Sequence, residues 1–150
     1  MKLTQKETAL LKDLAAQEQL CIAKYGHYAE IACSTELKAL LEDLCTVEKG
    51  HYESICQLQN GTVRPVKLPI KANNAHCVNA FYQDGQSAAN DAFICRDMLS
   101  SEKHASALYD TCVFEFTDPA ARKLLNYIQS EEQQHGERIY AYLAANGITA

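Results

Sequence analysis

The sequence has no long apolar run and no block of like charges. None of its apolar stretches approaches the roughly 20 residues that a membrane span requires, so we expect no membrane partner. The net charge is −5, and without a basic block it argues against a nucleic-acid partner. The first residues, MKLTQKETALLKDL, lack the apolar core of a signal peptide. We therefore expect a cytoplasmic chain.

Paired cysteines are also missing. The chain has seven cysteines but no CxxC pair, which argues against a zinc ribbon and against a rubredoxin-type iron site. Most of them stand beside Ala, Leu and Ile in helical patterns, as small buried hydrophobes do in a reducing compartment. The seven are Cys21, Cys33, Cys45, Cys56, Cys77, Cys95 and Cys112.

No segment alternates apolar and polar residues with period two, so the sequence predicts an all-α fold without a sheet. Thr4-x-x-Glu7 is a capping box, and Asp118-Pro119 is a second strong helix start. We predict a helical hairpin over residues 4–60, a connector over 61–86 and a second hairpin over 87–147. Within the connector, a short helical piece is expected around 75–82.

The two hairpins are repeats of each other. Shifting the chain by 84 residues aligns residues 10–58 with the second half without a gap. Each hairpin must bury its apolar stripe against the other, so residues 1–150 should form one domain. We predict a ferritin-like four-helix bundle in which the connector makes one long crossover.

Six polar residues stand on the apolar stripes, where leucine would be expected. In the first hairpin, Glu18 lies 16 residues before Ser34, while Glu48 and His51 lie 14 and 17 residues after it. Antiparallel helices that rise by about 1.5 Å per residue bring these three to one height, and the second hairpin repeats the arrangement. The predicted layer consists of Glu18, Glu48, His51, Glu102, Glu132 and His135.

Four buried carboxylates in one layer repel one another and are costly to desolvate. Two divalent cations would neutralise them, and this ligand set is that of dinuclear sites in ferritin-like bundles. We expect iron or manganese, with zinc as a substitute. Glu131 is a rival ligand, but it lies off the apolar series that contains Glu132. A metal-free, hydrogen-bonded polar layer remains the alternative.

The resemblance to ferritin-like dinuclear sites also suggests roles. Glu48 and Glu132 would bridge two ions, Glu18 and Glu102 would be terminal ligands, and each ion would take one histidine. Two tyrosines, Tyr25 and Tyr109, lie one heptad from Glu18 and Glu102. Either their hydroxyls orient ligands, or the two side chains only fill the core.

Two stretches resemble a known family. DMLSSEKHASALYDTCVFEFTDPAARKLLNYIQSEEQQHGERIYAYL, residues 97–143, is similar to the coat F domain of spore-forming bacteria. LTQKETALLKDLAAQEQLCIAKYGHYAEIA, residues 3–32, resembles the N-terminal half of the same ferritin-like spore coat proteins. The resemblance implies a location in the sporulating mother cell or the spore coat, with other coat proteins as partners. It identifies no reaction and no catalytic residue.

Three functions remain open at this point. The chain could be a dinuclear metal protein of the coat, a metal-dependent oxidase, peroxidase or catalase-like enzyme that protects the spore, or a metal-free structural protein of the coat. A homodimer is a further expectation. Its face would use the off-stripe residues Phe114, Phe116 and Tyr140.

Overall fold

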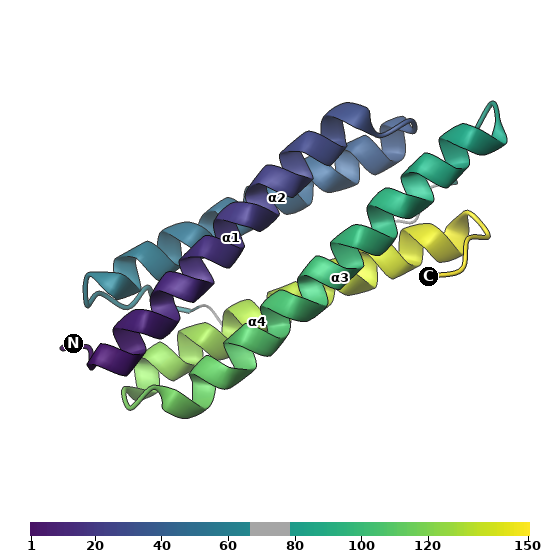
Figure 1. Ribbon diagram of the computed structural model, residues 1–150. Helices are drawn as coiled ribbons and strands as arrows, with labels where there is room; N and C mark the ends of the chain where they lie inside the picture. The colour runs from purple at the N-terminus through teal and green to yellow at the C-terminus, as the bar shows by residue number, and fades with distance from the viewer. Residues whose placement is uncertain (67–78) are drawn as a thin grey trace.

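The computed structural model describes residues 1–66 and 79–150, and in these ranges it contains four long helices and no strand (Figure 1). This confirms the predicted all-α class. None of the helices is both long and apolar enough to cross a membrane within the described ranges. The helices are α1 (Gln5–Ile31), α2 (Thr35–Gln59), α3 (Gly85–Glu115) and α4 (Pro119–Ala145).

Side-chain caps determine where the helices begin. Thr4 and Glu7 form the predicted capping box at α1: the Thr4 hydroxyl accepts from the Glu7 N–H at 3.1 Å, and Glu7 Oε2 accepts from the Thr4 N–H at 2.7 Å. Ser34 caps α2, and Asp118 caps α4 with Pro119 as the first helical residue. The predicted starts at the Thr4 capping box and at Asp118-Pro119 are therefore confirmed.

The start of α3 differs from the prediction. Asp84 accepts a hydrogen bond from the Ser87 N–H at 2.7 Å, so α3 begins at Gly85 and not at Ser87. The helical piece expected around 75–82 is wrong for residues 79–82, which are not helical, and its other four residues lie outside the described ranges. Short polar side chains such as Asp84 compete for backbone N–H groups, and the apolar pattern does not register them.

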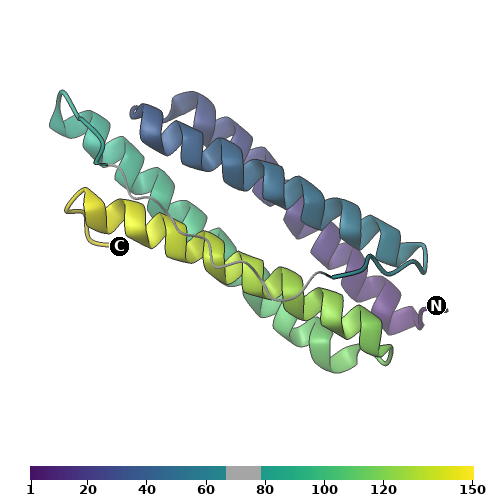
Figure 2. The same ribbon diagram turned by 180° about the vertical axis from the view of Figure 1, so that it is seen from behind.

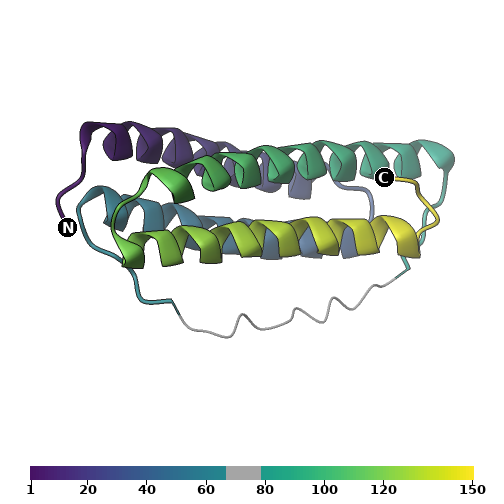
Figure 3. The ribbon, with the colours of Figure 1, turned by 90° about the horizontal axis from the view of Figure 1, so that it is seen from below.

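The two hairpins lie side by side as a four-helix bundle (Figure 1). Seen from below, after a turn of 90° about the horizontal axis, α1 and α3 form one layer and α2 and α4 form the second (Figure 3). Seen from behind, α2 and α4 are the nearer pair (Figure 2). The end of α2 and the start of α3 lie at opposite ends of the bundle (Figures 1 and 2), as the predicted long crossover requires.

The core consists of two apolar clusters, one toward each end of the bundle. One cluster contains Tyr25 and Ala29 of α1, and the other contains Leu11 and Leu14 of the same helix. Glu18 lies between these pairs in the chain, so the predicted polar layer separates the clusters. Phe116, which we expected on a dimer face, is instead buried in the second cluster, because the chain turns inward between α3 and α4.

Two buried acids, 84 positions apart, join the hairpins at opposite ends. Glu7 at the start of α1 accepts from the backbone N–H of Thr117, in the turn between α3 and α4, at 3.0 Å. Asp91 of α3 accepts from the N–H groups of Cys33 and Ser34, in the turn between α1 and α2, at 2.7 and 2.9 Å. Each hairpin thus satisfies otherwise unpaired backbone donors of the other.

Glu7→Gln tests this clamp. The backbone hydrogen bond from Thr4, together with that from Thr117, holds the pKa of Glu7 below its usual value of 4.5 despite burial. A lowered folded pKa stabilises the fold above the unfolded pKa and loses that contribution as the pH falls through the folded value. We expect Glu7→Gln to lower the free energy of unfolding by about 1–2 kcal/mol at neutral pH.

The difference between parent and variant should shrink steadily below about pH 4.5, because the glutamine does not titrate. Urea unfolding at a series of pH values, with a chelator present, measures it. Glu53→Gln, at an exposed position of α2, is the matched control and should change little. A Glu7→Gln deficit that is independent of pH would show that the carboxylate charge is not used.

Candidate metal centre

The structure brings all six predicted residues into one layer in the middle of the bundle. Glu18 comes from α1, Glu48 and His51 from α2, Glu102 from α3, and Glu132 and His135 from α4. None of them is more than 3% exposed. The three-residue spacing in Glu-x-x-His places both side chains of each pair on the inward face of one helix.

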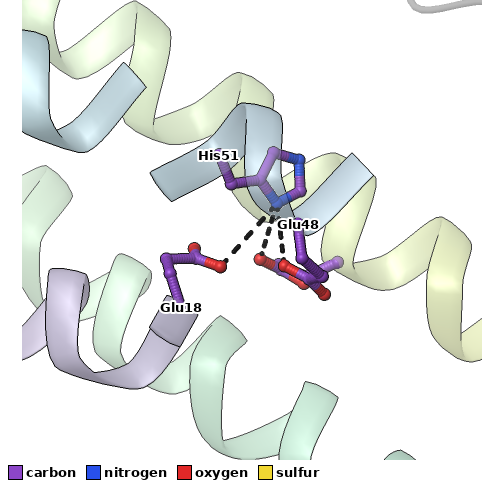
Figure 4. Close-up of side chains that lie close together, drawn as sticks. Glu18, Glu48 and His51 are labelled. Atoms are coloured by element: carbon purple, nitrogen blue, oxygen red, sulfur yellow. Dashed lines mark hydrogen bonds and ion pairs between the residues drawn. The ribbon is translucent and has the colours of Figure 1, made fainter. Parts of the chain in front are cut away.

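One ring nitrogen of His51 faces three carboxylates. Its Nδ1 donates to Glu48 Oε2 at 3.2 Å, lies 3.2 Å from Glu132 Oε1 and lies 4.0 Å from Glu18 Oε2. Figure 4 shows Glu18 and Glu48 turned toward this nitrogen from two different helices. Nδ1 is therefore the atom of His51 that points into the carboxylate layer.

His135 repeats the arrangement in the second hairpin. Its Nδ1 donates to Glu48 Oε1 at 3.1 Å and lies 3.4 Å from Glu102 Oε1 and 3.5 Å from Glu132 Oε2. The two imidazole rings are nearly parallel, with centroids 5.6 Å apart and an angle of 18° between their planes. The layer thus has two equivalent halves, related by the internal repeat.

The ligand atoms form two groups that share two residues. In each group one atom from each residue lies within 4.8 Å of all the others. Donors on opposite sides of an ion at about 2.1 Å lie about 4.2 Å apart, so small side-chain shifts would bring either group around a metal ion. Glu18 and His51 belong to one group, Glu102 and His135 to the other, and Glu48 and Glu132 to both.

The layer has too few hydrogen-bond donors for its acceptors. Its four carboxyl groups present eight oxygens. Both oxygens of Glu48, one of Glu18 and one of Glu102 accept hydrogen bonds. The remaining four, Glu18 Oε2, Glu102 Oε2 and both oxygens of Glu132, are buried without a hydrogen-bond partner among the described residues. Such groups are costly, and a metal ion is one partner that would satisfy them.

Two tyrosines cross between the hairpins to reach this layer. The Tyr25 hydroxyl on α1 donates to Glu102 on α3, and the Tyr109 hydroxyl on α3 donates to Glu18 on α1. Both rings are fully buried, so each tyrosine fills the core and also orients a carboxylate. The sequence left open whether these hydroxyls orient ligands, and the contacts join each tyrosine to the carboxyl group of the opposite hairpin.

Burial and hydrogen bonding divide the carboxyl groups into two kinds. Burial, together with the nearby Glu132 charge, raises the pKa of Glu18 well above its ordinary value, and burial likewise raises the pKa of Glu102. Burial also acts to raise the pKa of Glu48, but hydrogen bonds from His135 and His51 outweigh it and hold that pKa at about 2. Glu132 is shifted the same way: burial opposes ionisation, yet the adjacent Glu102 carboxyl group and the two histidines hold its pKa well below the ordinary range.

The histidines respond to the same carboxylates. Burial acts to lower the pKa of both rings, but the adjacent carboxylates of Glu131, Glu132 and Glu48 raise the pKa of His51 well above its ordinary value. The adjacent carboxyl groups of Glu102, Glu132 and Glu48 do the same for the pKa of His135. Without metal, these directions favour two neutral carboxyl groups, two carboxylates and two imidazolium rings, a combination without net charge.

Glu131 has a role that the sequence did not reveal. Its Oε2 accepts from Nε2 of His51 at 2.7 Å, on the side of the ring away from the layer, and its Oε1 accepts from the Tyr127 hydroxyl at 2.8 Å. This outer edge of His51 borders a cavity of about 400 Å³, which Arg64 also lines. The position that corresponds to Glu131 in the first hairpin is Val47, so the two halves of the layer differ here.

The second hairpin matches a known family. Residues 90–149 match the model of the Coat F domain. The second hairpin is a Coat F domain. The match includes Glu102, Glu132 and His135 of the layer, and it bears out the resemblance noted for residues 97–143. Residues 3–32 lie outside it, and the first half of the layer is connected to the family only through the internal repeat.

No curated protein and no solved structure matches the chain. The six cysteines within the described residues are free thiols, and four of them, Cys21, Cys45, Cys95 and Cys112, are buried as small hydrophobes. Burial raises the pKa of the Cys95 thiol to about 12 and that of Cys112 to about 11, which keeps both unreactive.

Tyr109→Phe tests whether the crossed tyrosines stabilise the carboxyl layer. Loss of the hydroxyl leaves Glu18 without its hydrogen-bond donor in a fully buried site. We expect the metal-free protein to lose about 1–3 kcal/mol in free energy of unfolding, measured by urea unfolding with a chelator. Tyr25→Phe should act similarly through Glu102.

Tyr28→Phe is the matched control. The Tyr28 hydroxyl donates to Asp97 at 2.7 Å in a half-exposed site, where water replaces the lost partner. It should therefore cost clearly less than Tyr109→Phe. Equal losses for the two variants would mean that the buried carboxyl group does not depend on the tyrosine.

Proposed function

We propose that this protein is a ferritin-like dinuclear metal carboxylate protein associated with the spore coat. The observation that carries the proposal is the buried layer of four carboxyl groups, in which half of the oxygens lack a hydrogen-bond partner among the described residues. The Coat F domain supports a place in the spore coat and contacts with other coat proteins.

The charge of the layer supports two ions and not one. Four carboxylates carry four negative charges, and two divalent cations balance them with both histidines neutral. Without metal, the same six residues reach neutrality by holding protons on Glu18, Glu102 and both histidines. Metal binding would therefore replace protons with cations inside a layer that stays neutral, which avoids the cost of a net buried charge.

The two groups of ligand atoms suggest which residues would hold each ion. Glu18 and His51 would hold one ion, Glu102 and His135 the other, and Glu48 and Glu132 would bridge them. Oxygen-rich sites with one imidazole per ion suit iron or manganese, with zinc as a substitute. When bound, such a pair of ions supplies redox or Lewis-acid chemistry.

The surrounding residues would hold the ligands in place. The hydroxyls of Tyr25 and Tyr109 fix one oxygen of each terminal carboxylate and leave the other free for an ion. Glu131 accepts from Nε2 of His51, which would keep the proton on that nitrogen, so that the Nδ1 lone pair would face the layer once an ion displaces the Nδ1 proton. These contacts exist without metal, so the layer is preorganised to bind.

A metal-dependent oxidase or peroxidase is the second candidate function. It is favoured by a cavity on the face of α3 and α4 that is lined by Glu102 and Glu132. A solely structural role for the metal would not require such an opening. A metal-free structural protein of the coat is the alternative that the following experiments would detect.

The first experiment counts the ions. Anaerobic reconstitution with ferrous iron or with manganese should give close to two ions per chain, measured by elemental analysis after desalting. The melting temperature should rise with free metal concentration, by about 2.7 kcal/mol of added stability at 100 times the dissociation constant, because the unfolded chain has no preformed site. A chain that binds no ion and melts at an unchanged temperature would be a metal-free structural protein.

The second experiment removes one nitrogen ligand. His135→Leu should weaken metal binding by about 10–100-fold or more while helix content is retained, because leucine is a strong helix former. The readout is the rise in melting temperature on adding metal, measured separately for each variant, so that any loss of stability in the metal-free state cancels. His51→Leu should behave in the same way.

His104→Leu is the control, because His104 is exposed and lies off the inward face. It should keep the full metal-induced rise in melting temperature. If His135→Leu also kept it, the histidine would not be a ligand, and the six-residue centre would be wrong.

A further inference from the structure

A cavity at the surface of α3 and α4 borders one side of the carboxylate layer. The cavity has a volume of about 540 Å³, and Glu102 and Glu132 form part of its wall. Glu102 Oε2 and both oxygens of Glu132 are among the buried oxygens without a hydrogen-bond partner in the described chain. The wall of the cavity also includes Leu99, Lys103, Gly136 and Tyr140.

A glycine makes this wall thin. A Cβ atom built on Gly136 would meet only Leu99 Cδ2, at 3.9 Å, so the space in front of the backbone is open. Gly136 follows His135 directly and lies one helical turn from Glu132. A glycine in the middle of a helix costs about 1 kcal/mol relative to alanine. The folding of α4 does not require it, since nothing else within 4 Å would meet a Cβ here.

The first hairpin covers the equivalent position with a ring. The residue 84 positions before Gly136 is Tyr52, and the residue 84 positions before Lys103 is Gln19. The Tyr52 hydroxyl accepts from Gln19 Nε2 at 2.9 Å, which joins α2 to α1 across the outside of the layer. The repeat therefore offers a direct comparison between a covered face and an open face.

The chemistry of the open face favours a small molecule without charge. The Lys103 ammonium lies 5.8 Å from the centre of the Tyr140 ring beside the opening, and its charge disfavours the approach of divalent cations. The carboxylates at the inner wall disfavour anions, and Leu99 adds an apolar side. Molecules of the size of dioxygen or hydrogen peroxide fit both conditions.

We propose that the α3–α4 face is the entrance through which a small uncharged oxidant reaches the carboxylate layer, and that Gly136 keeps it open. The inference rests on the proposed function for its use in redox chemistry. The entrance itself is a property of the metal-free fold. The two can therefore be tested separately.

The first test uses the metal-free protein and dissolved dioxygen as the probe. Dioxygen is paramagnetic and speeds the relaxation of methyl protons that it approaches, so the Leu99 methyl groups should relax faster under oxygen than under nitrogen. Gly136→Tyr should abolish this difference, and Gly136→Ala should largely retain it. Tyr52→Gly, the reverse exchange in the first hairpin, should produce a new oxygen effect at Ile22, whose repeat partner Ser106 lines the α3–α4 cavity.

The second test uses the protein loaded anaerobically with two ferrous ions per chain. Added hydrogen peroxide takes one electron from each ion and two protons from solvent to give two water molecules, and stopped-flow absorbance follows the oxidation. Gly136→Tyr should slow this step by about tenfold or more at unchanged metal content, while Gly136→Ala reacts like the parent.

The outcomes separate the two proposals. A chain that binds no iron would overturn the proposed function, and the dioxygen measurement would still decide the entrance. If Gly136→Tyr left both the Leu99 relaxation and the oxidation rate unchanged, the entrance would be elsewhere. Circular dichroism of Gly136→Tyr and Gly136→Ala should match the parent. If Gly136→Tyr alone had lost helix content, Tyr52→Gly would be the deciding variant. The absence of a new oxygen effect at Ile22 in that variant would overturn the proposed entrance.

Discussion

The burial of four carboxyl groups in one layer is the constraint on which the rest of the structure depends. An isolated carboxylate in an apolar core is so costly that it would sooner take up a proton. Here burial raises the pKa of Glu18 and Glu102, while the neighbouring histidines outweigh burial and lower the pKa of Glu48 and Glu132. A neutral layer is therefore available to the protein with protons alone, and cations could take their place.

The duplicated hairpin provides this balance by symmetry. Each half contributes a glutamate from its first helix and a Glu-x-x-His pair from its second, and each half supplies a tyrosine to the carboxyl group of the other. The acids at the ends of the bundle follow the same rule, since Glu7 and Asp91 each bind the turn of the opposite hairpin. These reciprocal contacts make the hairpins depend on one another, and they fix the height at which the two halves of the layer meet.

The departures from symmetry are as informative as the symmetry. Glu131 binds the outer nitrogen of His51, whereas Val47 stands at the matching position. Gly136 leaves the layer thinly covered on one face, whereas Tyr52 covers the other. Packing alone would be served by the same residue in both halves. Two ions in such a layer would have unequal surroundings. One would be next to His51, which is hydrogen-bonded to Glu131, and the other would be next to the cavity at Gly136.

The sequence by itself determined the four helices, their main caps and the membership of the polar layer. These features depend on local rules: the 3.6-residue period, the rise per residue and the side chains that cap a helix, and the repeat applied each rule twice. The start of α3 escaped because a single Asp84 side chain decided it. Phe116 was misplaced because a turn, which has no period, set its direction.

Only the tertiary structure decided what lies across from what. The heptad spacing named no partner for the tyrosine hydroxyls, and they reach the opposite hairpin because α1 packs against α3 in antiparallel orientation. Glu131 was predicted to lie off the inward face of its helix, yet the packing of α4 beside α2 brings its carboxylate to His51. The cavity beside Gly136 likewise depends on how far α3 and α4 stand apart. Sequence spacing fixes height and face along one helix, whereas contacts between hairpins depend on packing distances that no local pattern encodes.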